Sequence, residues 1–303
     1  MKKVILGLVL LVYAVLLFFG IKEKVLDVNY NDDPIYQKIL SYASSNNIDP
    51  IDAKYDLIWK RIPGLNGRIV DVEKSYENMK NDNIFDENKI IYKTAYPKKT
   101  LNNLQSGPIY KGNNNKKQVS FMINVAWGKE YINDMLEVLK NNNIKATFFI
   151  DGKFLEENEE LVKKIYTNGN EIGNHGYNHV DFTKLSKKEA KENILKTNNL
   201  LTSITNEPIN LFSPPSLAFS NSTISALDDL NMQLMMYSID TIDWQNPSVD
   251  LIKKRVLDNV SCGSIILMHP TKNTVDSLND IIIEINKKGL EIVTISTLIS
   301  PEL

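Results

Sequence analysis

The chain has 303 residues, of which 43% are hydrophobic and 24% charged, a mixture typical of globular proteins. Its formal net charge of −2 leaves no basic surplus, which argues against nucleic acid or an anionic membrane surface as an electrostatic partner. Cys262 is the only cysteine, so an internal disulfide is excluded.

The N-terminal segment has the pattern of a membrane anchor. Lys2 and Lys3 precede an apolar run over residues 4–21, which as a helix would span about 27 Å, close to one hydrocarbon core. The lysines favour an N-terminus in the cytoplasm and a body on the extracytoplasmic side. A cleaved signal peptide is the alternative, but the end of the run lacks the small residues of a convincing cleavage site. We therefore predict that residues 1–24 form an uncleaved single-pass anchor in the cell membrane.

Residues 25–112 are predicted to form a polar linker followed by a small, mainly helical module. Apolar residues have helical spacing over 35–43 and again over 50–59, and a short strand is expected over 68–72. This module shows no cluster of residues typical of catalysis. A turn rich in Asn and Gly at 112–115 marks the start of the main domain, residues 113–303.

In the main domain, predicted strands and helices alternate regularly. A capping box, Ser186 to Glu189, opens a long helix that extends to about residue 204. Such alternation requires a parallel sheet covered by helices, and functional residues are then expected at the carboxyl ends of the strands. The periodicity does not distinguish an open sheet from a barrel. The seven strands are expected at 119–125, 144–150, 171–173, 209–212, 233–239, 264–268 and 291–295.

All three histidines of the chain follow predicted strands. His175 and His179 are one helical turn apart, so both imidazoles can face one metal ion, although a pair of polar loop residues is the alternative. His269 could be a general acid or a hydrogen-bonded structural histidine. Asp243 could orient His269, or it could cap the following helix.

Five stretches resemble the polysaccharide deacetylase family, the NodB-homology group of carbohydrate esterase family four. They occur in the family's order within residues 117–299, and segment 122–128 looks like a sporulation-associated branch. The resemblance implies an α/β fold, a distorted seven-stranded (β/α) barrel, here preceded by the transmembrane helix and the small module. It also implies metal-dependent removal of N-acetyl groups from peptidoglycan or chitin-like cell-wall polysaccharide. The stretches are 145–149, 169–179, 212–215, 237–244 and 263–269.

The resemblance assigns roles to particular residues. His175 and His179 are expected to bind a divalent metal, for which we expect zinc. His269 is expected to protonate the departing amine, and Asp243 to tune it. Trp127 and Trp244 are expected to stack on sugar rings, with core packing as the alternative for both. Pro214 and Pro215 are expected to form a rigid loop that borders the substrate.

The chain departs from the family in its first motif. Where the family has two adjacent aspartates, a base and a metal ligand, this chain has Asn124 and Val125. Asn124 cannot accept a proton and Val125 cannot bind a metal, so the rate should fall roughly 10²- to 10⁴-fold from the lost base alone. The arginine expected at the position of Ser213 is also missing. We hypothesise that Asp151 replaces the missing ligand or base, with a helix cap as the alternative.

Two functions follow from these observations. The first is a metal-dependent polysaccharide N-deacetylase, supported by the retained histidines and Asp243. The second is a non-catalytic glycan-binding pseudoenzyme of the cell envelope, supported by Asn124, Val125 and Ser213.

Overall fold

The computed structural model describes residues 33–303, which form two compact units. Residues 33–48 and 68–94 belong to the smaller unit, and residues 49–67 and 95–303 to the larger one. The predicted anchor of residues 1–24 lies outside the described residues. Within the described part of the chain, no helix is long and apolar enough to cross a bilayer.

The smaller unit pairs two helices, α2 (Pro34–Asn46) and α3 (Val72–Met79), and includes strands β3 (Gly67–Val70) and β4 (Tyr92–Ala95), which pair with each other. Helix α2 confirms the helix expected over 35–43. Asp33 caps it by accepting a hydrogen bond from Ile35 N at 2.8 Å. Ile39 of α2 and Met79 of α3 are fully buried and give this unit a small apolar core of its own.

The boundary between the units does not fall at residue 112. Residues 54–62 form a hairpin of antiparallel strands, β1 (Lys54–Asp56) and β2 (Lys60–Ile62), so the helix expected over 50–59 is wrong. Strand β2 pairs with β5 (Pro108–Ile109), and β5 runs parallel to a strand of the main domain. Ile109 is fully buried in the interior of the larger unit, and this burial explains why these segments belong to it.

One curled sheet forms the larger unit, with the order β1-β2-β5-β10-β9-β8-β7-β6-β12-β11 and β13 beside β6. The strands from β5 to β11 in this order are parallel, as predicted from the alternation. Their bounds are β6 (Gln118–Val125), β7 (Thr147–Ile150), β8 (Glu171–Asn174), β9 (Leu211–Phe212), β10 (Gln233–Met235), β11 (Ile239–Asp240), β12 (Ile265–Met268) and β13 (Glu291–Ile292).

The strand expected over 233–239 is divided into two. Strand β10 pairs with β5 and β9, whereas β11 pairs with β12 at the other edge of the parallel part. Met236 N donates to Ile109 O of β5 at 2.8 Å, and Ser238 N donates to Ile265 O of β12 at 3.0 Å. Residues 236–238 therefore connect the β5 side of the sheet to the β12 side. A single segment of chain thereby joins the two sides of the curled sheet.

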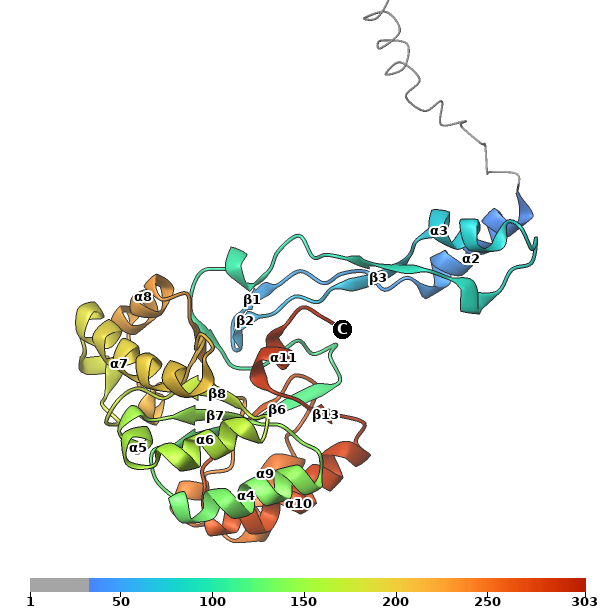
Figure 1. Cartoon of the computed structure of the whole chain (residues 1–303). Helices are drawn as coiled ribbons and strands as arrows, with labels where there is room; N and C mark the ends of the chain where they lie inside the picture. Colours follow the sequence, from blue (N-terminus) through green and yellow to red (C-terminus); the bar gives the residue numbers. More distant parts are fainter. Residues whose placement is uncertain (1–32) are drawn as a thin grey trace, which may run out of the picture. The chain divides into compact units, whose positions relative to one another are not determined.

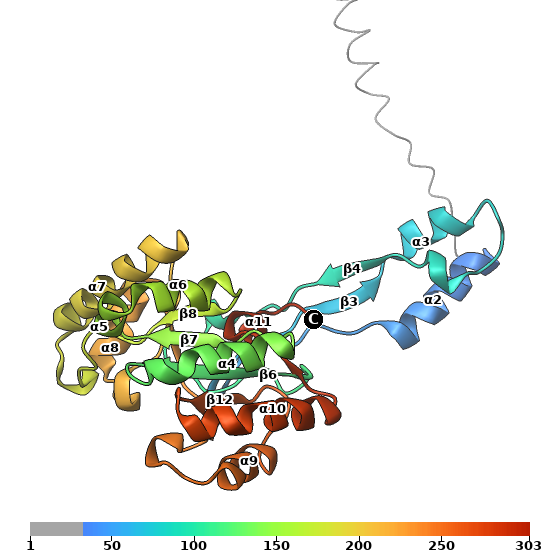
Figure 2. The ribbon, with the colours of Figure 1, turned by 60° about the horizontal axis from the view of Figure 1, so that its bottom comes forward.

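Helices cover the outside of this sheet. Helices α4, α9 and α10 lie together beside β6 and β12, and α5, α6, α7 and α8 lie together on the side of β7 and β8 (Figures 1 and 2). The predicted capping box is confirmed, because Ser186 and Glu189 bond reciprocally at the start of α7. The bounds are α4 (Lys129–Asn141), α5 (Gly152–Glu157), α6 (Glu159–Thr167), α7 (Lys187–Thr205), α8 (Asn221–Asp229), α9 (Val249–Leu257), α10 (Lys272–Lys287) and α11 (Ile295–Ile299).

Strand β6 shows how the sequence separates the two faces of the sheet. Phe121, Ile123 and Val125 belong to the apolar cluster under the helices, whereas Met122 belongs to the interior cluster. Side chains alternate along a strand, so Asn124 shares the interior face with Met122.

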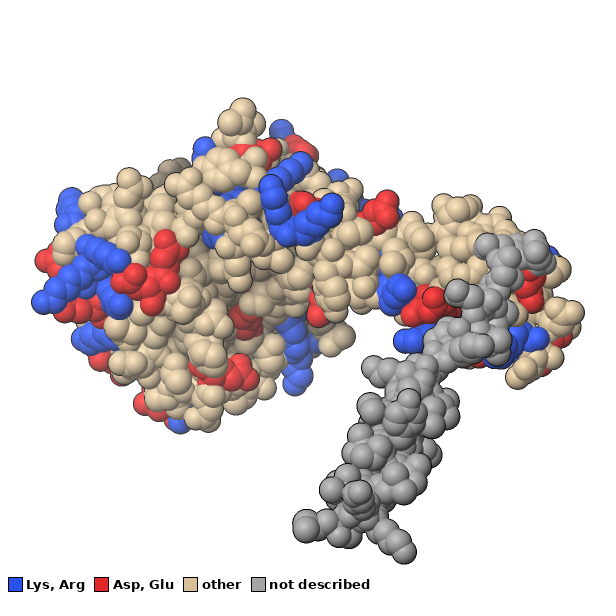
Figure 3. All heavy atoms as spheres, turned by 90° about the horizontal axis from the view of Figure 1, so that it is seen from above, with Lys and Arg blue, Asp and Glu red and all other residues tan. Residues whose placement is uncertain are grey.

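On the outer surface of the larger unit, basic and acidic side chains are interspersed over the face seen in Figure 3.

Candidate functional site

Side chains from the carboxyl ends of several strands meet around one cavity of about 450 Å³. All three histidines line it, although they come from distant parts of the sequence. Pockets of this size typically bind small molecules or single residues of a polymer. The lining residues are Asn124, Trp127, His175, His179, Ser216, Leu217, Tyr237, Asp240, Trp244, Leu267 and His269.

His175 and His179 face each other after strand β8, with ring centroids 5.4 Å apart. His175 is buried, and its Nδ1 lies 2.8 Å from Ser213 O, so Nδ1 donates the hydrogen and Nε2 keeps a free lone pair. Burial, and next the neighbouring His179, lower the pKa of His175 to about 3. His175 is therefore neutral near pH 7, the form in which an imidazole can bind a metal.

Asp151 occupies the helix-cap position that was the alternative for it. Its Oδ1 accepts hydrogen bonds from Lys153 N at 2.9 Å and Phe154 N at 3.1 Å at the start of α5. Its Oδ2 accepts from His179 N at 2.8 Å, which holds the loop that bears the second histidine. Each oxygen thus has a backbone donor, and Asp151 does not line the cavity, so the structure supports the helix cap and gives no support to Asp151 as a replacement ligand or base.

The residues present fit a divalent metal only in part. His175 and His179 offer two imidazoles, but catalytic zinc sites typically have three protein ligands. Val125, at the position of the family's carboxylate ligand, has its side chain in the apolar cluster under the helices. Among residues 33–303, no group of three His, Cys, Asp or Glu side chains is placed to hold an ion. We therefore derive no reaction step through a metal.

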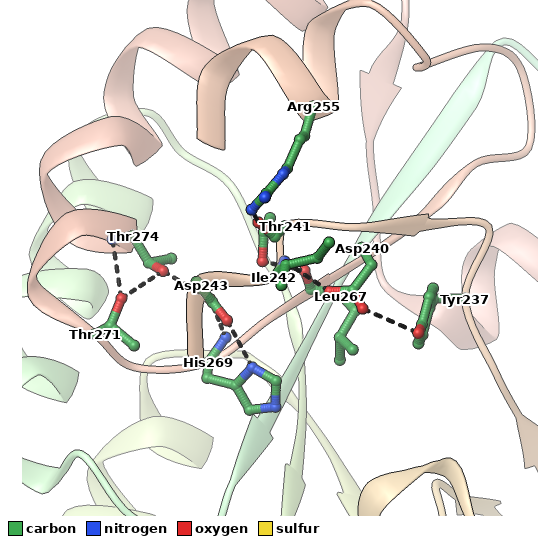
Figure 4. A network of polar contacts seen from close by, with 10 residues as sticks. All are labelled: Tyr237, Asp240, Thr241, Ile242, Asp243, Arg255, Leu267, His269, Thr271 and Thr274. Carbon is green, nitrogen blue, oxygen red and sulfur yellow. Dashed lines mark hydrogen bonds and ion pairs between the residues drawn. The ribbon is translucent and has the colours of Figure 1, made fainter. Parts of the chain in front are cut away.

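His269, which lines the same cavity, forms a hydrogen-bonded pair with the buried Asp243 (Figure 4). The ring Nδ1 of His269 donates to Asp243 Oδ1 at 2.7 Å, which turns Nε2 away from the carboxylate. Asp243 Oδ2 accepts from His269 N at 2.6 Å and from the Thr274 hydroxyl at 2.7 Å. The side chain of Asp243 is fully buried. The structure thus brings together the two residues that the sequence analysis paired.

Both predicted tryptophans line the cavity and are exposed rather than packed in the core. Trp127 is 44% exposed and stacks on the His269 ring, with centroids 5.7 Å apart and planes 8° from parallel. Trp244 is 57% exposed. Exposed indole faces beside a cavity are suited to stacking on sugar rings.

Pro214 and Pro215 do not line the cavity, contrary to prediction, because both are buried. The next two residues, Ser216 and Leu217, line it instead. Their φ angles of 50° and 59° lie in the left-handed region, which is strained for leucine. This backbone turn, which the sequence does not reveal, decides which side chains of the loop face the cavity.

Three further lining residues, Tyr237, Asp240 and Leu267, were not predicted from the sequence. The Tyr237 hydroxyl donates to Asp240 Oδ2 at 3.0 Å, and Asp240 Oδ1 accepts from Ile242 N at 2.7 Å. Burial, and then the charge of Asp240, raise the pKa of Tyr237. Asp240 therefore already has a donor on each oxygen. Tyr237 and Asp240 lie in the stretch 237–244 and Leu267 in the stretch 263–269, and both stretches resemble the family.

A match to the family model for polysaccharide deacetylase covers residues 111–235. The chain is 31% identical to a peptidoglycan-N-acetylglucosamine deacetylase of Bacillus cereus, covering 62% of this chain and 70% of that protein. It is also 40% identical to the uncharacterised protein YlxY of Bacillus subtilis, covering 92% of this chain and 88% of YlxY.

Solved structures of BA3943 of Bacillus anthracis, described as a CE4 family pseudoenzyme, are similar to this structure. The wild-type protein is 39% identical, with a TM-score of 0.78 over 89% of this chain and 96% of BA3943. A BA3943 mutant described as having restored enzymatic activity is 38% identical, with a TM-score of 0.79 over 88% of this chain and 98% of the mutant.

Proposed function

Since the chain belongs to the polysaccharide deacetylase family of the NodB and CE4 type, we propose that it is a deacetylase-like hydrolase of N-acetylated cell-wall glycan. Its site binds the acetylated sugar and hydrolyses the acetamide at a strongly reduced rate. The single observation that supports this proposal best is the cavity itself. His175, His179 and the His269–Asp243 pair converge there beside two exposed tryptophans.

The described residues divide the chemistry between binding and proton transfer. Trp127 and Trp244 offer flat faces to sugar rings at the cavity. Asp243 fixes the orientation of His269, so that Nε2 is free to donate a proton to a departing amine. No carboxylate stands at the position of the base, because Asn124 occupies it. The missing base explains why we expect slow hydrolysis, roughly 10²- to 10⁴-fold below that of a complete site.

A non-catalytic glycan-binding protein is the second candidate. It is favoured by Asn124 and Val125 at the positions of the base and the carboxylate ligand, and by the similarity to BA3943, which is described as a pseudoenzyme. In this case the cavity would bind N-acetylated glycan without hydrolysing it. Both candidates predict the same partner and differ only in turnover.

We also propose where the protein acts and which ion it would use. The apolar run at 4–21 supports a single-pass anchor in the cell membrane, with the body on the extracytoplasmic side facing the wall. The resemblance of segment 122–128 supports a role in sporulation. Zinc, or another divalent metal, would bind through His175 and His179, and weakly because a carboxylate ligand is missing.

Acetate release from N-acetylglucosamine oligomers in the presence of zinc tests the proposal. We expect slow release from the wild-type protein that is lost in His269→Ala, and faster release in Asn124→Asp. This variant returns a carboxylate base to the cavity wall, at a residue that lines it. Saturable oligomer binding without acetate release from the wild type would establish the second candidate. If the protein neither binds the oligomers nor releases acetate, both candidates are refuted.

A further inference from the structure

A second cavity of the larger unit, of about 550 Å³, lies at the other end of the parallel strands from the histidines. Asn210, directly before β9, and Gln233, the first residue of β10, line it, so it opens at the amino ends of these strands. It shares no lining residue with the histidine cavity. The two cavities are therefore separate sites.

A buried arginine forms part of the wall of this second cavity. Arg61 of β2 is 5% exposed. Its Nη1 donates to Gly107 O at 3.2 Å and to Gln233 Oε1 at 2.8 Å, and its Nη2 donates to Leu101 O at 2.8 Å. These neutral acceptors use three of the five N–H groups of the guanidinium. Among residues 33–303, Nε has no partner, and one N–H of the adjacent Nη2 is also left unbonded.

Fastening the loop of residues 101–107 to the sheet accounts for the three bonds of Arg61 but not for its charge. Burial lowers the pKa of Arg61, because removal from water disfavours the charged form. Buried charges are usually paired with an opposite charge, since an unpaired one is costly. Nε and Nη2 are neighbouring donors, of the kind that hold the two oxygens of one carboxylate. An anionic group at the cavity would therefore complete the bonding of Arg61.

One carboxylate lines the same cavity without pairing with Arg61. Asp228, near the end of α8, is exposed there, and its charge opposes the effect of burial on the pKa of Arg61. In the part of the chain that the structure describes, no ion pair joins the two side chains. A simple anion bound at Arg61 would be repelled by Asp228, and a simple cation at Asp228 would be repelled by Arg61. The two charges together favour a ligand that carries both signs.

We propose that this second cavity binds a small zwitterion, an amino acid or short peptide with free amino and carboxyl ends. The ligand carboxylate accepts hydrogen bonds from Arg61, and the ligand ammonium group lies against Asp228. The volume is in the usual range for small-molecule sites. Neutral carboxamides make up much of the remaining wall and can bond to a peptide group between the two charges: Asn102, Asn210, Asn231 and Gln233.

Ligand-observed NMR titration of the full chain tests this inference with three probes near neutral pH. Alanyl-alanine carries both charges, whereas its N-acetylated form and its C-terminal amide have each lost one. We expect alanyl-alanine to bind about 10-fold or more tightly than either blocked form, because each blocked end loses a charge-assisted hydrogen bond. Similar dissociation constants for all three probes, or no binding of alanyl-alanine, would overturn the proposal.

Two adjacent aspartates supply a variant and its matched control. Asp228→Asn should weaken the binding of alanyl-alanine about 10-fold, because the contact to the ammonium group loses its charge. Asp229→Asn removes the same charge from α8, but Asp229 pairs with Lys187 and Lys191 and does not line the cavity, so binding should be unchanged. Equal effects of these two substitutions would overturn the zwitterion site.

The carboxylate contact is tested by Arg61→Lys, which keeps the charge but loses the paired donors. It should weaken alanyl-alanine more than the C-terminal amide, and equal weakening of both probes would overturn the contact. If this variant fails to fold, the comparison of the three probes on the wild-type protein decides. Because the two cavities share no lining residue, failure of this inference leaves the proposed function intact, and acetate release tests that function separately.

Discussion

Replacing Asp243 by alanine tests the buried pair that orients His269. The substitution removes one carboxylate and leaves three donors without their acceptor: His269 N, His269 Nδ1 and the Thr274 hydroxyl. At about 1 to 1.5 kcal/mol for each lost hydrogen bond, the free energy of unfolding should fall by about 3 to 4.5 kcal/mol. That range agrees with the cost of removing one partner from other buried pairs.

Urea unfolding measures this loss, and NMR supplies a local check. The Nδ1–H proton of His269 should exchange slowly with water in the wild-type protein and rapidly in Asp243→Ala, because the acceptor at 2.7 Å is gone. Asp250→Ala is the control, since that side chain is 91% exposed, and it should change the stability by about 0.5 kcal/mol or less. A loss below about 1 kcal/mol for Asp243→Ala would refute the argument that this carboxylate holds the three donors in a buried network.

Three further substitutions test other parts of the larger unit. Gly128→Ala should lower the melting temperature and disturb Trp127, because a Cβ would lie 2.1 Å from Pro270 O and φ is +80°; near-ultraviolet circular dichroism and thermal unfolding measure both effects. Phe121→Ala should cost about 3 to 5 kcal/mol in urea unfolding, because its ring is fully buried on the long strand β6. Asp229→Asn should lower the urea midpoint slightly at neutral pH, since Lys187 and Lys191 of α7 lower the pKa of Asp229. That contribution is complete above the ordinary value of 3.8 and disappears as the pH falls through the lowered pKa, so the two proteins should converge in acid.

Much of the site could be predicted because parallel strands place their carboxyl ends together. His175 and His269 follow different strands, and that rule alone was enough to bring them to one cavity. Asp151 was ambiguous for a physical reason. A helix cap and a metal ligand both require a carboxylate after a strand, and only the bonds to Lys153 N and Phe154 N distinguish them.

The hairpin over 54–62 could not be predicted from apolar spacing. Leu57 and Ile58 are apolar but lie at its turn, 88% and 72% exposed, so the helical period that they suggested reflects no buried face. The division of residues 233–240 between two strands was equally hidden. It depends on pairing with β5 and β12, which lie near opposite ends of the strand order.

Strands β2 and β5 protect what would otherwise be an open edge of the main sheet. Strand β5 pairs with β10, so a fragment that begins at residue 113 would expose the backbone donors and acceptors of β10 to other molecules. Such a fragment should aggregate, although it retains all three histidines. Strand β2 runs antiparallel to β5. The turn that precedes β2, at Leu57 and Ile58, therefore lies at the carboxyl end of the parallel strands, where the cavity is. Residues upstream of the segment that matches the family model therefore complete its sheet and contribute apolar surface at its functional end.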